Sequence, residues 1–278
     1  MPLVPLDLKA GFYRNGTEFD ASNRWRDGSL VRWRDGSLRP IGGWQTFKSG
    51  FCTNPIRGAH AWESLNGSAY FAAGSHNELT AMVGSGTTYD ITPTSMTTGR
   101  EDAGLNLGFG GGFYGTGYFG TQRPATGTYS EASSWSLDNF GQVLIATVKN
   151  GRTFEWNPIA TTPGALQTRA TVVSGAPTTA VQTIVSERDR HLLVLGTETT
   201  IGTTATQDKM FVRFSDQENI SDYTPTSINT AGTLRLDSGT KIVGAAKGKD
   251  YILILTDTSA YIIQFVGPPF TFSVRQVG

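Results

Sequence analysis

Short apolar runs separated by polar turns recur along most of this chain, and this pattern predicts β-strands. The clearest example covers residues 135–158. Its apolar run at 143–148 is followed by the turn dipeptide Asn150-Gly151 and by residues 153–156, where aromatic and polar side chains alternate. Asn-Gly tolerates positive φ at both central positions of a tight hairpin. With a first turn at 138–141, the stretch predicts three strands joined by two turns, which is a β-meander.

Three further stretches repeat this order of strands and turns, at residues 61–83, 183–214 and 242–265. The spacing of the units is irregular, about 50 to 70 residues, and repeated meanders are typical of β-propeller blades. Short strands at such spacings also occur in two-sheet sandwiches. We predict an all-β fold, a β-propeller-like array of antiparallel meander blades.

The predicted organisation has two parts. Residues 1–50 form an N-terminal extended arm with β-hairpins, and residues 51–278 hold the blades, with a glycine-rich and aromatic insert at about 94–128. Four meanders are close to the lower limit for closing a propeller. Because the chain also stops directly behind a predicted strand at 270–278, we expect an incomplete or fragmentary chain.

Composition narrows the class of protein. The 34 glycines and 12 prolines among 278 residues favour turns, and no stretch shows convincing helical periodicity. Basic and acidic residues balance at 23 each, whereas a dedicated nucleic-acid binder is strongly basic. The single cysteine, Cys52, excludes an internal disulfide framework and a cysteine-rich zinc site. No apolar run reaches the length of about 18 residues that indicates a membrane-spanning helix, so we predict no membrane span.

An arginine-rich doublet marks the N-terminal region, where the sequence Arg-Trp-Arg-Asp-Gly-Ser-Leu occurs at 24–30 and again at 32–38. Each copy predicts a strand that runs into a tight turn at Asp-Gly, with Val31 and Trp33 on one face and the arginines on the other. One interpretation is a basic strip that contacts DNA phosphates or an acidic neighbouring subunit. The residues of that strip are Arg24, Arg26, Arg32 and Arg34. The other is a solvated strand face with weak Arg–Asp pairs across the hairpin.

The insert at 94–128 interrupts the meanders and is dominated by glycine and aromatic residues between 104 and 120. It contains a formal G-x-G-x-x-G pattern at Gly110, Gly112 and Gly115, but that pattern indicates dinucleotide binding only between a strand and a helix. We predict no helix here and no cofactor. The aromatic side chains predict a loop that docks on a neighbouring subunit. They are Phe113, Tyr114, Tyr118 and Phe119. The alternative is a loop folded over its own domain.

Motifs of catalytic or metal sites are missing from the sequence. His60, His76 and His191 lie far apart, and no H-E-x-x-H, G-x-S-x-G or P-loop pattern occurs. The acidic residues of the connection 214–225 do not have the spacing of an EF-hand, so we expect a solvated loop instead of a calcium site. We predict a protein that is not an enzyme and holds no metal. A Ser-His-Asp set or a carboxylate pair assembled from separate blades stays compatible with the sequence.

Several short motifs resemble one family of bacteriophage proteins. They are Asn23-Arg-Trp-Arg-Asp-Gly-Ser-Leu-Val-Arg-Trp-Arg-Asp-Gly, Pro40-Ile-Gly-Gly-Trp, Trp135-Ser-Leu-Asp-Asn-Phe-Gly, Phe154-Glu-Trp-Asn-Pro, Phe214-Ser-Asp-Gln-Glu and Tyr223-Thr-Pro. Together they cover most of the chain. They resemble the nozzle protein of short-tailed phages, also called tail tubular protein B, and the related packaged-DNA stabilisation proteins.

The resemblance implies a structural component of the virion tail, assembled in the host cytoplasm. In that family six copies form a tube below the adaptor ring, each with a β-propeller on the outside, and DNA leaves through the channel. The implied partners are five further copies, adaptor or portal-side tail proteins, tail spikes or fibres, and viral DNA in transient non-specific contact. Members of the family are longer than this chain, and no catalytic residues come with the resemblance.

Two other functions are compatible with an array of meanders. A carbohydrate-binding or carbohydrate-cleaving propeller used in host recognition predicts aromatic residues and carboxylates that converge at one mouth. An intracellular scaffold propeller predicts a monomer.

Overall fold

The computed structural model describes residues 9–43, 45–84, 86–101, 133–158 and 168–278. The chain divides into an N-terminal unit, residues 1–49, and a sheet unit, residues 50–278. Strands are the main regular secondary structure in the described residues of both units, and the helical element there is the short 3-10 turn η2 (Thr204–Thr206). The predicted all-β class is therefore confirmed. Among the described residues there is no helix long and apolar enough to cross a membrane.

The N-terminal unit contains two small sheets. Strand β3 (Val31–Arg34) pairs with β4 (Ser37–Pro40) in an antiparallel hairpin. Its turn has positive φ at both central residues, 52° at Asp35 and 73° at Gly36. Along β3, half-buried and exposed side chains alternate. The prediction for the second arginine-rich copy is confirmed, both in its turn and in the separation of Val31 and Trp33 from the arginines.

For the first arginine-rich copy the predicted strand is confirmed, but the predicted tight turn is wrong. Its residues form β2 (Arg24–Trp25), which pairs in parallel with β1 (Lys9–Phe12) and does not enter a hairpin. Asp27 instead accepts a hydrogen bond from the Gly28 amide and forms an ion pair of 2.8 Å with Arg14. The Asp-Gly dipeptide is thus fixed as an open loop, and the same sequence takes two conformations in the two copies.

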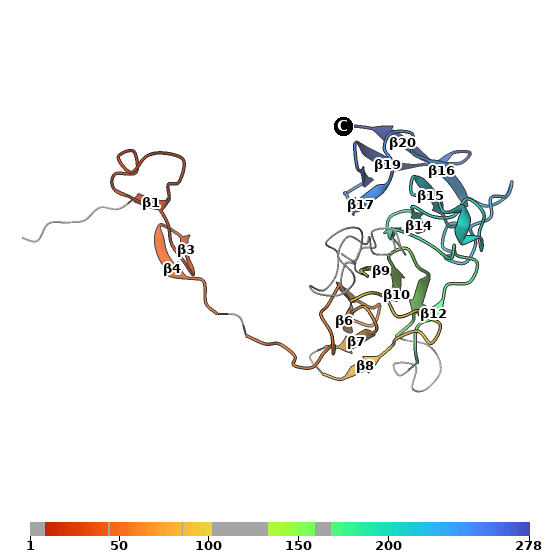
Figure 1. The fold of residues 1–278 in the computed structure, drawn as a ribbon, viewed down its shortest axis with the longest axis horizontal. Coiled ribbons are helices and arrows are strands. Elements are labelled where there is room, and N and C mark those ends of the chain that lie inside the picture. Colours follow the sequence, from red (N-terminus) through yellow and green to blue (C-terminus); the bar gives the residue numbers. More distant parts are fainter. Residues whose placement is uncertain (1–8, 44, 85, 102–132, 159–167) are drawn as a thin grey trace, which may run out of the picture. The chain divides into compact units, whose positions relative to one another are not determined.

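The described residues of the sheet unit form four antiparallel sheets, each with four strands in chain order (Figure 1). The first sheet contains β5 (Gly58–Glu63), β6 (Ala69–Gly74), β7 (Leu79–Val83) and β8 (Thr88–Asp90). The second contains β9 (Trp135–Phe140), β10 (Val143–Val148), β11 (Thr153–Trp156) and β12 (Thr171–Val172). The third contains β13 (Gln182–Ser186), β14 (His191–Leu195), β15 (Phe211–Phe214) and β16 (Gly232–Arg235). The fourth contains β17 (Ile242–Lys247), β18 (Ile252–Thr256), β19 (Ala260–Gly267) and β20 (Thr271–Gln276). The four predicted meanders are confirmed. The first three sheets each have a fourth strand that was not predicted, and the fourth sheet ends with the strand predicted at 270–278.

In the second sheet one predicted turn is misplaced, and the other lies at the predicted dipeptide with positive φ at one of its two residues. The segment expected to form the first turn begins inside β9, because Asp138 points its carboxylate at the neighbouring sheet, where the amide of Val185 donates to it over 2.7 Å. The turn follows at Gly141, whose φ is 62°. In the second turn only Asn150 has positive φ, because the Gly151 amide donates to Val148 and its carbonyl accepts from the amide of Ala180 in the connection to β13.

The sheets pack face to face in sequence, and buried apolar side chains fill each gap. The first and second sheets share a cluster around Trp62, Trp135 and Trp156. The second and third share one around Ile145 and Leu192, and a further cluster joins the third and fourth sheets. The first strands β5, β9, β13 and β17 contact one another in succession. The second and third sheets are thus covered on both faces, and no closed barrel or propeller is formed by the described strands.

Candidate functional site

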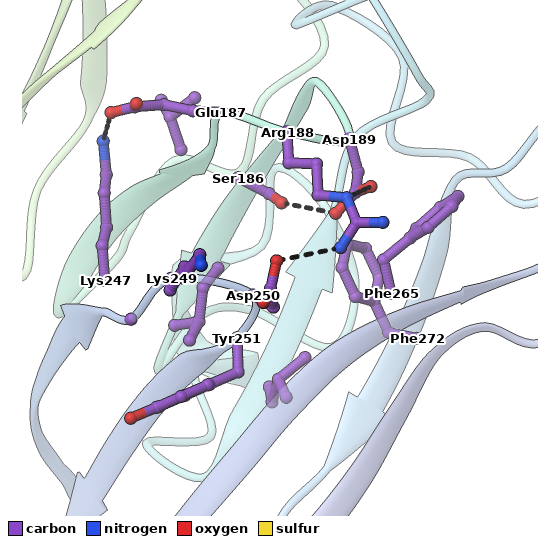
Figure 2. Close-up of a pocket in the computed structure, with 14 residues that line it drawn as sticks. Ser186, Glu187, Arg188, Asp189, Lys247, Lys249, Asp250, Tyr251, Phe265 and Phe272 are labelled. Carbon is purple, nitrogen blue, oxygen red and sulfur yellow. Dashed lines mark hydrogen bonds and ion pairs between the residues drawn. The ribbon is translucent and has the colours of Figure 1, made fainter.

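A pocket of about 400 Å³ lies between the third and fourth sheets (Figure 2). It is called the inter-sheet pocket below. Its rim is built by two equivalent segments, residues 186–189, where β13 ends in a turn, and residues 248–251, which follow β17. Its floor is apolar and includes Ile263, Phe265 and Phe272. Because each turn follows the first strand of its meander, the repeat itself places the two charged turns side by side.

Arg188 is the central charge of the rim. Its Nη1 lies 3.1 Å from Oδ1 of Asp250, and its Nε lies 3.9 Å from Oδ1 of Asp189. The hydroxyl of Ser186 donates to the other carboxylate oxygen of Asp189 over 3.2 Å. Figure 2 shows the guanidinium between the two carboxylates. The Arg188 side chain is 70% exposed, so these ion pairs orient the rim and contribute little to stability.

Lys247 closes the opposite side of the pocket. Its Nζ lies 2.6 Å from Oε1 of Glu187 and 2.7 Å from Oδ1 of Asp138. Burial opposes the charged ammonium, but hydrogen bonds and attraction to these two carboxylates outweigh it and raise the pKa of Lys247 above its ordinary value. The lysine is therefore a charged link between three sheets and is unsuited to act as a base.

Phe265 and Phe272 of the pocket floor also enclose His191. The ring is fully buried, its Nδ1 donates to the carbonyl of Ser215 over 2.8 Å, and its Nε2 has no hydrogen-bond partner among the described residues. Burial lowers the pKa of His191, against the opposing influence of the Ser215 carbonyl and of the Asp189 and Asp216 carboxylates. The neutral ring belongs to the packing of the third and fourth sheets.

The chemistry of the pocket suits recognition of a neutral polar ligand. Three basic and three acidic side chains line it, so their charges cancel: Arg188, Lys247 and Lys249 against Glu187, Asp189 and Asp250. Within the described residues, no group of three or more His, Cys, Asp or Glu side chains is arranged to hold a metal ion. No sequence motif marks this pocket. The sequence feature that could have revealed it is the equivalent position of the two charged turns in successive repeats.

The predicted arginine strip lies on the surface of the N-terminal unit. Arg26 forms an ion pair of 3.0 Å with Glu18, and the guanidinium of Arg24 lies 5.7 Å from the ring centre of Tyr13. The weak contact of Arg34 is with its neighbour Asp35, at 3.8 Å. These contacts are local ones, and they leave all three arginines exposed to solvent.

Arg32 has an unusual position in the hairpin. It stands directly opposite Arg39 in the register of β3 and β4. Both side chains are exposed, and like charges at opposed positions of an antiparallel pair repel each other. Arg–Asp pairs across the hairpin would neutralise the positive charge of this face, but they do not form within the described residues.

Two other groups of candidate residues have different outcomes. The docking residues Phe113, Tyr114, Tyr118 and Phe119, together with the glycine pattern, lie outside the described residues.

In the connection 214–225 the carboxylates fix the loop. Asp216 accepts from the amide and hydroxyl of Thr230, and Glu218 forms an ion pair of 3.0 Å with Arg190.

No protein-family model matches the chain. A search of curated proteins finds no match.

Proposed function

We propose that this chain is a structural subunit of a bacteriophage virion tail, a nozzle, tail-tube or head-to-tail completion protein that forms part of a hexameric conduit for DNA ejection. The observation that carries the proposal is an architecture built for contact with other chains. The described residues of the N-terminal unit form no buried apolar cluster, and the stack of sheets has apolar outer faces. The motifs quoted above for the nozzle family support the same conclusion.

The N-terminal unit leaves its large apolar side chains exposed. Phe19, Leu30 and Phe47 are 92%, 73% and 75% exposed, and Ala21 is the one fully buried side chain among its described residues. Two-stranded sheets are marginally stable in water without a surface to pack against. An arm of this kind gains stability by lying on a neighbouring subunit, as expected for the part of a tail protein that holds a ring together.

We further propose that the four sheets form an open, propeller-like array of blades. Three features support it: the strands of each sheet follow chain order, the first strands of successive sheets contact one another, and the inner sheets are covered on both faces. Propellers contain four to eight such blades. In the virion the array would meet adaptor or portal-side proteins and tail spikes or fibres.

Transient contact with DNA follows from the distribution of charge. The opposed pair Arg32 and Arg39 is relieved when an anion, such as a phosphate, lies between the side chains. The chain as a whole carries no net charge, with 23 basic and 23 acidic residues. A conduit wall with a few phosphate contacts lets DNA slide, whereas a strongly basic wall would hold it.

Mass photometry and negative-stain microscopy of the full-length protein test the proposal. Sixfold rings with a central channel are the expected result. A shortened chain that begins at residue 50 keeps all four sheets and their apolar clusters, so it should fold and yet form rings less readily. A monomer at micromolar concentration that also fails to associate in the presence of phage tail proteins would contradict the assignment.

Carbohydrate binding is the second candidate, and the inter-sheet pocket favours it. Aromatic side chains and carboxylates converge there, as a sugar-binding site requires. In this case a purified monomer would bind host surface oligosaccharides, measured by isothermal titration calorimetry. Arg188→Ala would abolish the binding without affecting the fold, because the side chain is 70% exposed.

A further inference from the structure

The fourth sheet has an apolar face that no described residue covers. The pairing of Leu253 with Ala246 and Ile262 places these three side chains on the face turned away from the third sheet, because paired residues of antiparallel strands share a face. Leu255 lies on the same face and is 44% exposed. Val243, in a bulge of β17, is 58% exposed. This surface is called the outer face of the fourth sheet.

The inner sheets show what such a face normally contacts. In β9, Trp135 packs toward the first sheet while Phe140 packs toward the third. In β13, Val185 packs toward the second sheet and Ile184 toward the fourth. Each of these strands alternates apolar side chains on both faces and has a sheet on each side. The fourth sheet has the same two-sided pattern, with a sheet on one side.

The first sheet ends the stack differently. Its outer face also carries Phe71 and Met82, but Met82 is buried and Phe71 is half-buried. The exposed positions on this face have small side chains, namely Ala59, Ala61 and Ala69. Phe51 covers one part of this face, with its ring centre 5.2 Å from that of Phe71. The exposed side chains at the two ends of the stack therefore differ in size, because bulky aliphatic groups are exposed at one end and alanines at the other.

The charges at the two ends are also opposite. The outer face of the fourth sheet carries Arg275, which is paired with Ile262 and exposed. The outer face of the first sheet carries Glu63, which is paired with Ala69 and exposed. Opposite charges at the edge of two apolar patches favour one orientation of contact over two like ends meeting.

We propose that the outer face of the fourth sheet of one copy packs on the outer face of the first sheet of a second copy. The contact continues the packing of successive sheets across the boundary between subunits. It is heterologous, so repetition by rotation gives a ring when the geometry closes. The inference rests on the proposed function and deepens it by naming the surface that joins neighbouring subunits.

Cysteine cross-linking tests the contact directly. In a Cys52→Ser background, Val243→Cys and Ala61→Cys are introduced singly and together. Packed sheets are about 10 Å apart, so a short bis-maleimide of similar span is the reagent. The double variant should give a ladder of linked chains on a denaturing gel, and an equimolar mixture of the two single variants should give a linked dimer. Neither single variant should link by itself.

Other results would overturn the inference in recognisable ways. A linked dimer of Val243→Cys alone would mean that two fourth sheets meet. A cross-link inside one chain would mean that the stack closes on itself. Rings without any cross-link in the double variant would reject the contact and leave the proposed function standing. A protein that is monomeric in mass photometry would reject both.

A second pair of variants gives an independent readout. Leu255→Asp places a charge on the outer face and should convert rings to monomers with an unchanged circular dichroism spectrum. Ile228→Asp is the matched control, because Ile228 is 95% exposed in a loop. It should keep the rings. Equal ring fractions in the two variants would count against the contact even if both are well folded.

Discussion

The Nζ of Lys247 lies 2.7 Å from Oδ1 of Asp138, although the two residues stand in the fourth and second sheets and are separated by the third. The Asp138 side chain is only 7% exposed, and its other oxygen accepts from the amide of Val185 in the third sheet. One carboxylate thus joins the first strands of three sheets. It replaces the backbone hydrogen bonds that strands of different sheets cannot make.

Removal of this carboxylate should loosen the stack. Asp138→Ala leaves the amide of Val185 without its acceptor and Lys247 without its buried partner, and we expect a loss of about 2–4 kcal/mol in the free energy of unfolding. Urea unfolding followed by tryptophan fluorescence measures it. Asp250→Ala is the matched control, since it removes the exposed ion pair with Arg188. It should cost less than about 1 kcal/mol. Equal effects would show that the buried position of Asp138 is unimportant.

The arginine hairpin should control the contact with DNA. Replacement of both Arg32 and Arg34 by alanine should weaken binding of double-stranded DNA of any sequence. The slope of log K against log salt should fall by about 1 for each arginine that contacts a phosphate. Fluorescence anisotropy of a labelled duplex over a salt series gives the slope. Arg188→Ala removes an equally exposed arginine outside the hairpin and should leave the slope unchanged. An unchanged slope in the double variant would exclude phosphate contact by the hairpin.

The strands were predictable where local sequence alone determines them. Val143–Val148 and Thr153–Trp156 form β10 and β11 with the expected limits, because β-branched and aromatic residues alternate there between strong turn signals. The last strands of the first three sheets were harder to predict. Strands such as β12, with two residues, pair only because a neighbour is already in place.

The errors at Asp138 and at the first arginine copy arose because local sequence does not determine either conformation. Asp138 depends on partners distant in the sequence, and the arginine motif adopts two different conformations in its two copies. Aspartate is a residue type common in turns, but the partners of Asp138, Val185 and Lys247, hold it in a strand. The inter-sheet pocket was missed for the same reason, because Arg188 and Asp250 are brought together by sheet packing and not by spacing.

Close packing between the first two sheets makes Gly74 sensitive to substitution. A Cβ atom at this position would lie 2.4 Å from the indole of Trp135, whose Nε1 donates to the carbonyl of Ser75. Gly74→Ala should therefore displace the indole and cost about 2–4 kcal/mol through overpacking and a lost hydrogen bond. Thermal unfolding measures the effect. Gly244→Ala is the control, since its Cβ would meet only the Gln182 side chain at 3.9 Å. A similar melting temperature for both variants would contradict the predicted clash.

The buried ring of His191 should make stability depend on pH. Because burial lowers its pKa in the folded protein, the unfolded chain takes up a proton first as the pH falls below about 6.5. The contribution of the neutral ring is fully present above that pH and is lost progressively below it. The urea midpoint should therefore decrease as the pH is lowered from 7.5 to about 5. This range lies well above the pH at which aspartates such as Asp216, whose pKa is lowered in the fold, become protonated.

The variant His191→Asn separates this effect from other titrations. Asparagine retains an N–H donor for the carbonyl of Ser215 but has no titrating ring. Its packing against Phe265 and Phe272 is poorer, so the variant should be less stable at every pH, with a midpoint that is nearly constant between pH 7.5 and 5. If the variant loses stability over this window as steeply as the natural protein, then His191 is not the group that titrates.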